Sequence, residues 1–471
     1  MSGGCCGATT TEIEAPVGRL EQLALPVVVI GAGPVGLAAA ANLVERGLDF
    51  VVVEAGAQVG ASIAQWQHVR LFSPWRFDID AASRRLLEAE GWAAPEAAQL
   101  PTGGELVDDY LVPLSKHPEI SARLRLGTKV VAISRAGYDR VRTVGREDVP
   151  FVVRLDDGEE IAARAVVDAS GTYATPNVLG ANGLPALGEG AAAELIDRAM
   201  PDVLGADRDR FAGRHTLVVG AGHSAATTLI LLARLAAEVP ETRITWAIRG
   251  GSAGRTYGGG AADALPARGA LGTRVRELVE AGVIELRTGF FTHDVRPTSA
   301  GVEVVSRQPS GVEQPVVADR IVAATGFRPD HTIASELRLD LDPILGSTRA
   351  LAPLIDPNQH SCGTVPPHGV DHLTHPEAGY YAVGVKSYGR APTFLLATGY
   401  EQVRSVVAAL DGDWVAARDV RLELPETGVC SSNVAIDQLA TVGLATGISG
   451  GLVGTALPLV TADAGGGGCC G

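Results

Sequence analysis

The stretch LPVVVIGAGPVGLAAAANLVERGLDFVVVEAG, residues 25–56, decides the fold. Its parts follow one another as an apolar run, a glycine-rich turn, an apolar helical stretch and a second apolar run, at residues 27–30, 31–36, 34–46 and 50–53. The second apolar run closes on Glu54. We predict a strand, a turn, a helix and a strand in that order, which is the unit with which a Rossmann-like domain binds a dinucleotide.

The three glycines of this turn have separate tasks. Gly31 permits the tight turn, Gly33 lets the backbone approach a pyrophosphate, and Gly36 lets the helix and the strand pack closely. The start of the helix adds free N–H groups and a partial positive charge for the phosphate. Glu54 can accept hydrogen bonds from a ribose diol. We therefore predict that these four residues bind a cofactor.

The same unit recurs in GRHTLVVGAGHSAATTLILLARLAAEVPETRITWAIRG, residues 213–250. Here Ala225 replaces the third glycine, and the second predicted strand ends in Arg249 instead of an acid. An acid at that place would repel a 2′-phosphate, whereas an arginine can pair with it, so the sequence favours NADPH over NADH. The predicted residues of this second site are Gly220, Gly222, Ser224, Ala225 and Arg249.

Two such units in one chain indicate two nucleotides, FAD in the first unit and the NADPH that reduces it in the second. At this point the chain resembles the two-dinucleotide-binding-domain flavoproteins, which include the flavin-containing monooxygenases and the pyridine-nucleotide disulfide reductases. AVVDASGTYATPN at 165–177 and IVAATGFRPD at 321–330 are similar to the two return strands of that superfamily. The resemblance covers about residues 25–412.

The resemblance implies an α/β fold of two Rossmann-like domains, with the NADPH domain inserted into the FAD domain. The expected parts are a flexible tail at 1–19, an FAD-binding domain at 20–180 and 331–415, an NADPH-binding domain at 181–330, and a C-terminal segment with a flexible Cys-Cys tail at 416–471. Residues 379–384 are expected to form a buried strand. A helix within 390–403 is expected to start near Pro392, and in relatives such a helix points its N-terminus at the flavin ring.

The cysteine spacing bears on the branch of the superfamily to which the chain is similar. Disulfide reductases need a cysteine pair spaced CxxC or CxxxxC beside the flavin, and this chain has no such spacing. The stretch WQHVRLFSPW, residues 66–75, resembles the flavin-side loop of flavin-containing monooxygenases, where aromatic side chains would exclude water. An alternative stays open, in which Trp66, Phe72 and Trp75 are domain core. The monooxygenase hallmark FxGxxxHxxxY/F is absent, and no catalytic residue is identified.

A pair of adjacent cysteines flanked by glycines occurs near each end of the sequence, in GGCCG at 3–7 and in GGGGCCG at 465–471. Adjacent cysteines close only a strained disulfide ring, whereas two neighbouring thiolates suit one soft ion such as Cu(I), Hg(II) or As(III). The predicted ligands of such a metal or metalloid are Cys5, Cys6, Cys469 and Cys470. A third ligand could come from the other tail, Cys362 or Cys430. Cross-linking between chains, and no role at all, are the alternatives.

The whole arrangement resembles the monooxygenase-like FAD/NADPH flavoproteins found with bacterial arsenic-resistance genes. The segments that carry this likeness are GAGPVGLAAA, WQHVRLFSPW, SYGRAPTFLLATGYEQVRS and the two CCG tails. The resemblance implies that arsenite or an organoarsenical, captured by the vicinal cysteines, is oxidised. The alternatives are a flavin reductase of a disulfide, quinone or metal ion, a monooxygenase of organic sulfur or nitrogen, and a non-enzymatic metalloid-binding flavoprotein.

Composition limits the partners and the location. The formal net charge is -15 and the chain has no basic run, so a nucleic acid is not an expected partner. The first residues lack the basic and apolar pattern of a signal peptide, which predicts a cytoplasmic protein. Residues 439–460 are uncharged and long enough to span a bilayer, but Pro458 interrupts them and positive flanks are missing, so no span is expected. A homodimer is compatible with the sequence.

Overall fold

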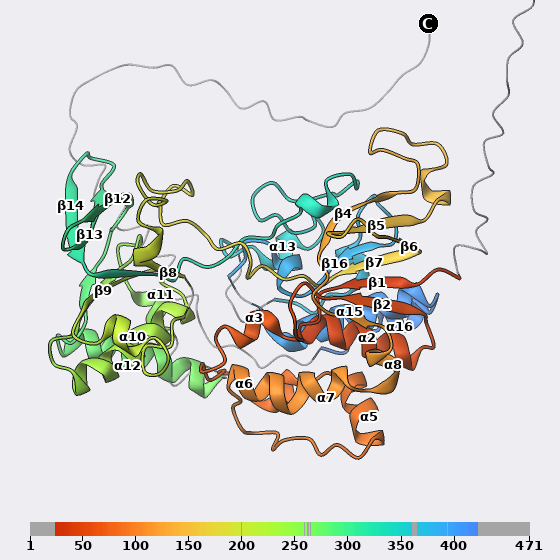
Figure 1. Cartoon of the computed structure of the whole chain (residues 1–471), viewed down its shortest axis with the longest axis horizontal. Helices are drawn as coiled ribbons and strands as arrows, with labels where there is room; N and C mark the ends of the chain where they lie inside the picture. Colours follow the sequence, from red (N-terminus) through yellow and green to blue (C-terminus); the bar gives the residue numbers. More distant parts are fainter. Residues whose placement is uncertain are drawn as a thin grey trace, which may run out of the picture. The chain divides into compact units, whose positions relative to one another are not determined.

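The computed structural model describes residues 24–198, 200–258, 260, 263, 265–359, 365–392 and 394–422 (Figure 1). All six cysteines lie outside these residues, and so does the apolar segment 433–460. The metal ligands expected at Cys5, Cys6, Cys469 and Cys470 therefore stay a prediction. Within the described part of the chain, no helix is long and apolar enough to cross a membrane. The described residues also contain no group of three or more His, Cys, Asp or Glu side chains suited to a metal ion.

The first sheet has five parallel strands in the order β16-β7-β1-β2-β3. These strands are β1 (Val27–Ile30), β2 (Phe50–Val53), β3 (Leu124–Arg125), β7 (Ala165–Asp168) and β16 (Tyr380–Ala382). The chain leaves β1 toward β2 on one side and returns to β7 on the other, so the boundary between β1 and β7 is the topological switch point. Because β16 comes last in the chain, two separate segments build this sheet.

Alternate residues of β1 pack into two different layers. Val27 and Val29 belong to the cluster that contains the helices, whereas Val28 and Ile30 pack against an antiparallel meander. This follows from the period of two in a strand. The helices of the first layer include α2 (Pro34–Glu45), α15 (Leu396–Leu410) and α16 (Trp414–Arg418), and the meander consists of β4 (Val130–Arg135), β5 (Phe151–Leu155) and β6 (Glu160–Ala163). The sheet thus lies between helices and a meander (Figure 1).

Short helices fill the connection between β2 and β3 and the segment before α15. The first group is α3 (Ala61–Ala64), α4 (Trp75–Asp78), α5 (Ala81–Ala89), α6 (Gly103–Glu105), the π-helix η1 (Leu106–Leu111), α7 (Val112–Ser115) and α8 (Pro118–Ser121). The second group is η5 (Thr332–Ala334), α13 (Ala352–Ile355), α14 (Val370–Leu373) and η6 (Gly384–Tyr388). A further short helix, η2 (Arg146–Asp148), stands between β4 and β5.

The second sheet repeats the build of the first. Its order is β11-β10-β9-β15-β8, so β9 occupies the place of β1 and β15 that of β7. The elements of residues 193–323 are η3 (Ala193–Leu195), β8 (Ile196–Arg198), α9 (Arg208–Phe211), β9 (His215–Val219), α10 (His223–Glu238), β10 (Arg243–Ala247), α11 (Gly254–Tyr257), α12 (Pro266–Glu280), β11 (Glu285–Arg287), β12 (Thr292–Thr298), β13 (Gly301–Arg307), β14 (Glu313–Ala318) and β15 (Arg320–Ala323). Of these, β12, β13 and β14 form a separate antiparallel meander. The α/β fold with two Rossmann-like sheets is confirmed, while the predicted domain boundaries stay a prediction.

One predicted element begins elsewhere. The helix expected to start near Pro392 is α15, and it starts at Leu396. The chain before it is fixed in another path, because Gly389 has a φ of 59° and the amide of Arg390 donates to the carbonyl of Leu345 at 2.8 Å. A proline at a helix start is favourable but does not by itself place the start. Tertiary contacts of the preceding loop decide it here.

Candidate functional site

The first glycine-rich turn follows β1 directly and requires two of its three glycines for steric reasons. Gly31 has a φ of 97°, and a Cβ on it would lie 2.8 Å from the carbonyl oxygen of Ala169, which follows β7. A Cβ on Gly36 would lie 1.9 Å from the carbonyl oxygen of Gly31. No side chain fits at either position. The two glycines therefore allow β1, α2 and the end of β7 to pack in close contact at this turn.

Gly33 differs from its two neighbours because its surroundings are open. It is the N-cap of α2 with φ -80° and ψ -175°, an ordinary extended conformation. Apart from the glycine and its two chain neighbours, no heavy atom of the described chain lies within 4 Å of an ideal Cβ at this position, and no side chain of that part caps the helix. An open cradle at an uncapped helix start fits the phosphates of a dinucleotide, since the first N–H groups of a helix lack partners inside it.

Glu54 ties the end of β2 to the same turn. Its Oε2 accepts a hydrogen bond from the Ala32 amide at 2.7 Å, and its Oε1 accepts one from the Gly56 amide at 2.7 Å. Each carboxylate oxygen has a second lone pair. The structure thus places Glu54 beside the turn, and its contact with a ribose stays a prediction.

The second turn, after β9, is built in the same way. Gly220 has a φ of 138°, and a Cβ on it would lie 2.1 Å from the carbonyl oxygen of Ala324, which follows β15 as Ala169 follows β7. Gly222 is the N-cap of α10, and apart from its chain neighbours no described heavy atom lies within 4 Å of its ideal Cβ. The alanine in third place, Ala225, is fully buried. Its methyl group is accommodated in a turn whose first carbonyl, that of Gly220, accepts the indole N–H of Trp246 at 2.7 Å.

The other two predicted residues of the second site lie at the same edge of the sheet. Ser224 is the second residue of α10 and is partly exposed. Arg249 follows the end of β10, which pairs with β9, and is exposed. One of its N–H groups donates to the carbonyl of Ala181 at 2.9 Å. A guanidinium group has five N–H donors, so donors remain for a phosphate.

The flavin-side loop expected at 66–75 divides between core and surface. Trp75 is 3% exposed and belongs to the helical core cluster, and Trp66 packs against that cluster. The structure thus favours the core interpretation for both. Phe72 is partly exposed, and its ring centroid lies 5.1 Å from that of His223, the first residue of α10. Phe72 therefore contacts the second glycine-rich turn.

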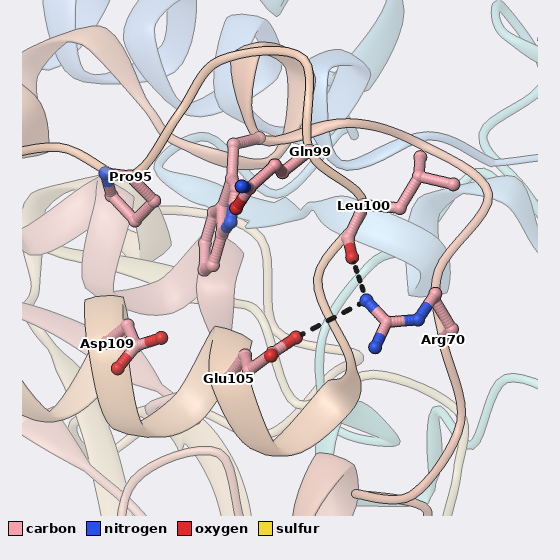
Figure 2. Close-up of a pocket in the computed structure, with 7 residues that line it drawn as sticks. Arg70, Pro95, Gln99, Leu100, Glu105 and Asp109 are labelled. Atoms are coloured by element: carbon pink, nitrogen blue, oxygen red, sulfur yellow. Dashed lines mark hydrogen bonds and ion pairs between the residues drawn. The ribbon is translucent and has the colours of Figure 1, made fainter.

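A pocket of about 290 Å³ opens beside this loop (Figure 2). Its described lining residues are Arg70, Trp75, Pro95, Gln99, Leu100, Glu105 and Asp109. Arg70 donates to the carbonyl of Leu100 and pairs with Glu105 at 3.7 Å. Burial, together with the nearby charges of Glu105 and Asp108, raises the pKa of Asp109. None of these described lining residues comes from either glycine-rich turn, so the pocket is separate from both cradles.

Sequence reasoning missed several buried titratable side chains. Asp168 and Lys386 form an ion pair at 2.6 Å whose side chains are 0% and 2% exposed. Asp78 is fully buried, and burial, opposed by a hydrogen bond from Ser73, raises its pKa to about 7. One signal was present, because an acid that ends an apolar strand, as in AVVD at 165–168, needs a buried partner.

The comparisons with known proteins agree with this architecture. The chain belongs to the pyridine nucleotide-disulphide oxidoreductase family, whose model matches residues 28–360. It is therefore a flavoprotein oxidoreductase that uses FAD. Indole-3-pyruvate monooxygenase YUCCA1 of Oryza sativa subsp. japonica is 27% identical over 206 residues. The chain spans less than half of that relative, since the match covers 44% of each protein.

Solved structures show the same fold. Bacillithiol disulfide reductase from Bacillus cereus matches with a TM-score of 0.60 and 18% identity, covering 82% of this chain and 99% of that one. A cadaverine monooxygenase from Erwinia amylovora, solved with FAD, matches with a TM-score of 0.58 and 14% identity, covering 86% and 98%. A flavin monooxygenase from Stenotrophomonas maltophilia matches with a TM-score of 0.53 and 22% identity, covering 82% and 98%. At these identities the likeness concerns the fold.

Proposed function

We propose that the first glycine-rich turn holds FAD and that the second holds NADPH. The observation that carries this assignment is the pair of open cradles at Gly33 and Gly222, each at the start of a helix. Glu54 beside the first cradle suits a ribose, and Arg249 beside the second suits a 2′-phosphate. NADPH would supply the hydride and FAD would carry its electrons to the final acceptor. The chain's own part is to bind both nucleotides and to exclude water.

We further propose a monooxygenase-like reaction on a trivalent arsenical or a related soft metalloid. NADPH, a proton and dioxygen would be consumed, one oxygen atom would oxidise the arsenical to the pentavalent state, and the other would leave as water. The repeated Cys-Cys pairs at Cys5, Cys6, Cys469 and Cys470 support this substrate, because vicinal thiolates prefer soft ions. The acidic net charge of -15 supports a small molecule, and not a nucleic acid, as the partner.

A disulfide reductase is the candidate that the sequence disfavours. No two of the six cysteines have the CxxC or CxxxxC spacing that such an enzyme needs beside its flavin. The 27% identity to an indole-3-pyruvate monooxygenase favours, as a second candidate, a monooxygenase of an organic substrate in which the tails only regulate. The two candidates differ in what the cysteines do.

The test measures NADPH oxidation and oxygen uptake by the FAD-loaded protein with no addition, with arsenite and with methylarsenite. A variant with Cys5, Cys6, Cys469 and Cys470 all changed to Ser is measured beside it. The proposal predicts turnover that arsenicals stimulate and that falls at least about tenfold at low arsenical concentration in the variant, since capture by the thiolates is lost. A second variant, with Cys362→Ser and Cys430→Ser, shows whether either residue supplies the third ligand: stimulation that is kept would leave that ligand to the other tail.

Other results would point elsewhere. Turnover that neither the arsenicals nor the four Cys→Ser changes affect would overturn the metalloid assignment. Faster NADPH oxidation with a quinone or a disulfide, without oxygen uptake, would indicate a flavin reductase. Stoichiometric binding of As(III) without any NADPH consumption would indicate a binding protein.

A further inference from the structure

We propose that the buried pair of Asp168 and Lys386 positions Ser170 as a contact for the flavin-bearing half of FAD. This inference rests on the proposed place of FAD in the first glycine-rich turn. Asp168 and Lys386 would be positioning residues beneath the cofactor, and Ser170 would be the residue that touches it. The ligand chemistry is that of the ribityl hydroxyls, because Ser170 donates its one O–H to Asp168 and keeps a lone pair that can accept a hydrogen bond from a ligand hydroxyl.

The contacts around the pair leave Ser170 one orientation. The ammonium of Lys386 donates to Asp168 Oδ2 at 2.6 Å and to Ser170 Oγ at 3.0 Å. Ser170 in turn donates to Asp168 Oδ1 from its hydroxyl at 2.6 Å and from its amide at 3.1 Å. Tyr380 completes the network by donating its hydroxyl to Asp168 Oδ2 at 2.9 Å. Ser170 itself is exposed. A surface hydroxyl is thus held from below by two buried charges.

The network around Asp168 lies at the topological switch point between β1 and β7. Asp168 ends β7 and pairs in register with Ile30, the last residue of β1. A Cβ on Gly31 would lie 3.2 Å from the Cα of Ser170, so the serine adjoins the first glycine-rich turn. Lys386 lies in η6, just after β16 ends. Dinucleotides bind outside the carboxyl ends of the strands at such a point.

The direction of the cofactor follows from Glu54. Glu54 lies at the end of β2, on one side of β1, and is the residue suited to the adenosine ribose. With the pyrophosphate at the start of α2, the other half of FAD must run to the opposite side of β1. That side carries β7 and β16, and therefore Ser170 and Lys386.

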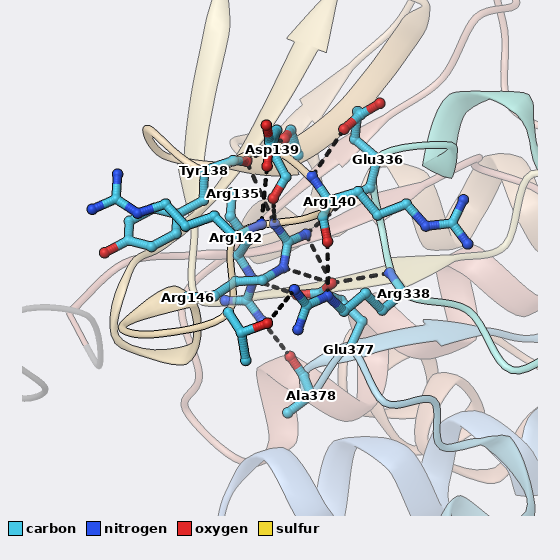
Figure 3. Close-up of polar contacts among 12 residues, drawn as sticks. Arg135, Tyr138, Asp139, Arg140, Arg142, Arg146, Glu336, Arg338, Glu377 and Ala378 are labelled. Carbon is cyan, nitrogen blue, oxygen red and sulfur yellow. Dashed lines mark hydrogen bonds and ion pairs between the residues drawn. The ribbon is translucent and has the colours of Figure 1, made fainter.

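A second buried ion-pair network in the same domain offers a matched comparison. Glu377 accepts hydrogen bonds from Arg135 at 2.8 Å and from Arg146 at 2.9 Å, and all three side chains are 5% exposed or less (Figure 3). Glu377 lies just before β16 begins, at the amino ends of the strands. It shares the burial of the Asp168 network but lies at the edge away from the cradle. Substitutions in either network should therefore lower stability. Only substitutions in the Asp168 network should also weaken FAD binding.

The experiment measures thermal unfolding of the apoprotein and the FAD dissociation constant by fluorescence titration. The variants are Lys386→Met, Asp168→Asn, the double variant of both, and Glu377→Gln as the control. Each single change leaves a buried charge or its hydrogen bonds unpaired and should lower the unfolding temperature. The double variant removes both charges and should recover most of that loss. It should nevertheless bind FAD at least about tenfold more weakly than the wild type, while Glu377→Gln should keep the wild-type affinity.

The opposite pattern would overturn the inference. A double variant, refolded and stable, that binds FAD with unchanged affinity would show the pair to be structural only. Equal weakening in Glu377→Gln would show that FAD affinity follows stability and not the position of Ser170. Failure of the underlying placement gives a different signature, because Gly33→Val would then bind FAD as the wild type does. None of these readouts requires NADPH or an arsenical.

Discussion

Gly36 and Ala225 hold the same place in two copies of one unit, yet only one of them tolerates a side chain. In the first turn a Cβ at position 36 would meet the Gly31 carbonyl oxygen at 1.9 Å. We expect Gly36→Ala to destabilise the protein by about 1–3 kcal/mol, as overpacking does, and to weaken FAD binding. Urea unfolding and FAD titration measure both effects. The reciprocal change, Ala225→Gly, should cost only about 0.5–1 kcal/mol through chain entropy. Equal costs at the two positions would contradict this account.

Asp78 gives a prediction of pH dependence. It is fully buried, its Oδ2 has no hydrogen-bond partner among the described residues, and burial raises its pKa to about 7. A carboxyl whose folded pKa lies above its unfolded value contributes stability that is complete below the unfolded pKa, near 3.8, and is lost as pH rises to about 7. Stability curves of the wild type and of Asp78→Asn should therefore diverge by about 3 kcal/mol between pH 5 and pH 8, in favour of the variant. Parallel curves would rule out the raised pKa.

The sequence predicts the glycines of the cradles because their conformations are local. Gly31, Gly33 and Gly36 are needed by a turn whose strand and helix are visible on either side of it. The buried charges were not predicted, because their partners are distant in the chain. Lys386 and Asp168 are 218 residues apart, and only the pairing of β16 with β7 brings them together.

At the scale of elements, strands were easier to predict than the start of a helix. The strands at 27–30 and 50–53 agree with β1 and β2, because each is a short apolar run that ends at a glycine or an acidic residue, Gly31 or Glu54. The predicted start of α15, near Pro392, was wrong. The left-handed conformation of Gly389 and the hydrogen bond from Arg390 fix a non-helical path, and the helix begins only at Leu396. The four residues of β1 are all apolar, so the sequence could not show which of them pack against the helices and which against the meander.

The end of β10 carries a prediction about cofactor choice. Arg249 is exposed beside the second cradle, where a 2′-phosphate would distinguish NADPH from NADH. We expect Arg249→Ala to raise the KM for NADPH about tenfold while changing that for NADH little, because one charge-assisted contact is lost. Steady-state kinetics with both nucleotides measure this. Arg274→Ala, on the surface of α12 and paired with Glu277, is the control and should change neither value. An equal effect on both nucleotides would contradict the role of Arg249.

At the scale of the whole molecule, the chain uses one architecture twice. The two parallel sheets have equivalent orders around β1 and β9, and each has a three-stranded antiparallel meander on one face. The edge strand differs, since β8 precedes its sheet in the chain and β16 follows its sheet. Both glycine-rich turns press against the residue after a return strand, Ala169 or Ala324. The repeated motif predicted this duplication, and the meanders lacked a comparable signal.

The most direct test of two nucleotides in two cradles uses the matched variants Gly33→Val and Gly222→Val. Both glycines have extended conformations and open surroundings, so a side chain should leave the fold intact and fill the space for a phosphate. The measurement is bound FAD per protein and its anaerobic bleaching by NADPH. We predict that Gly33→Val loses FAD, whereas Gly222→Val keeps FAD but is no longer reduced by NADPH. The reverse pattern, or full reduction in Gly222→Val, would contradict the assignment.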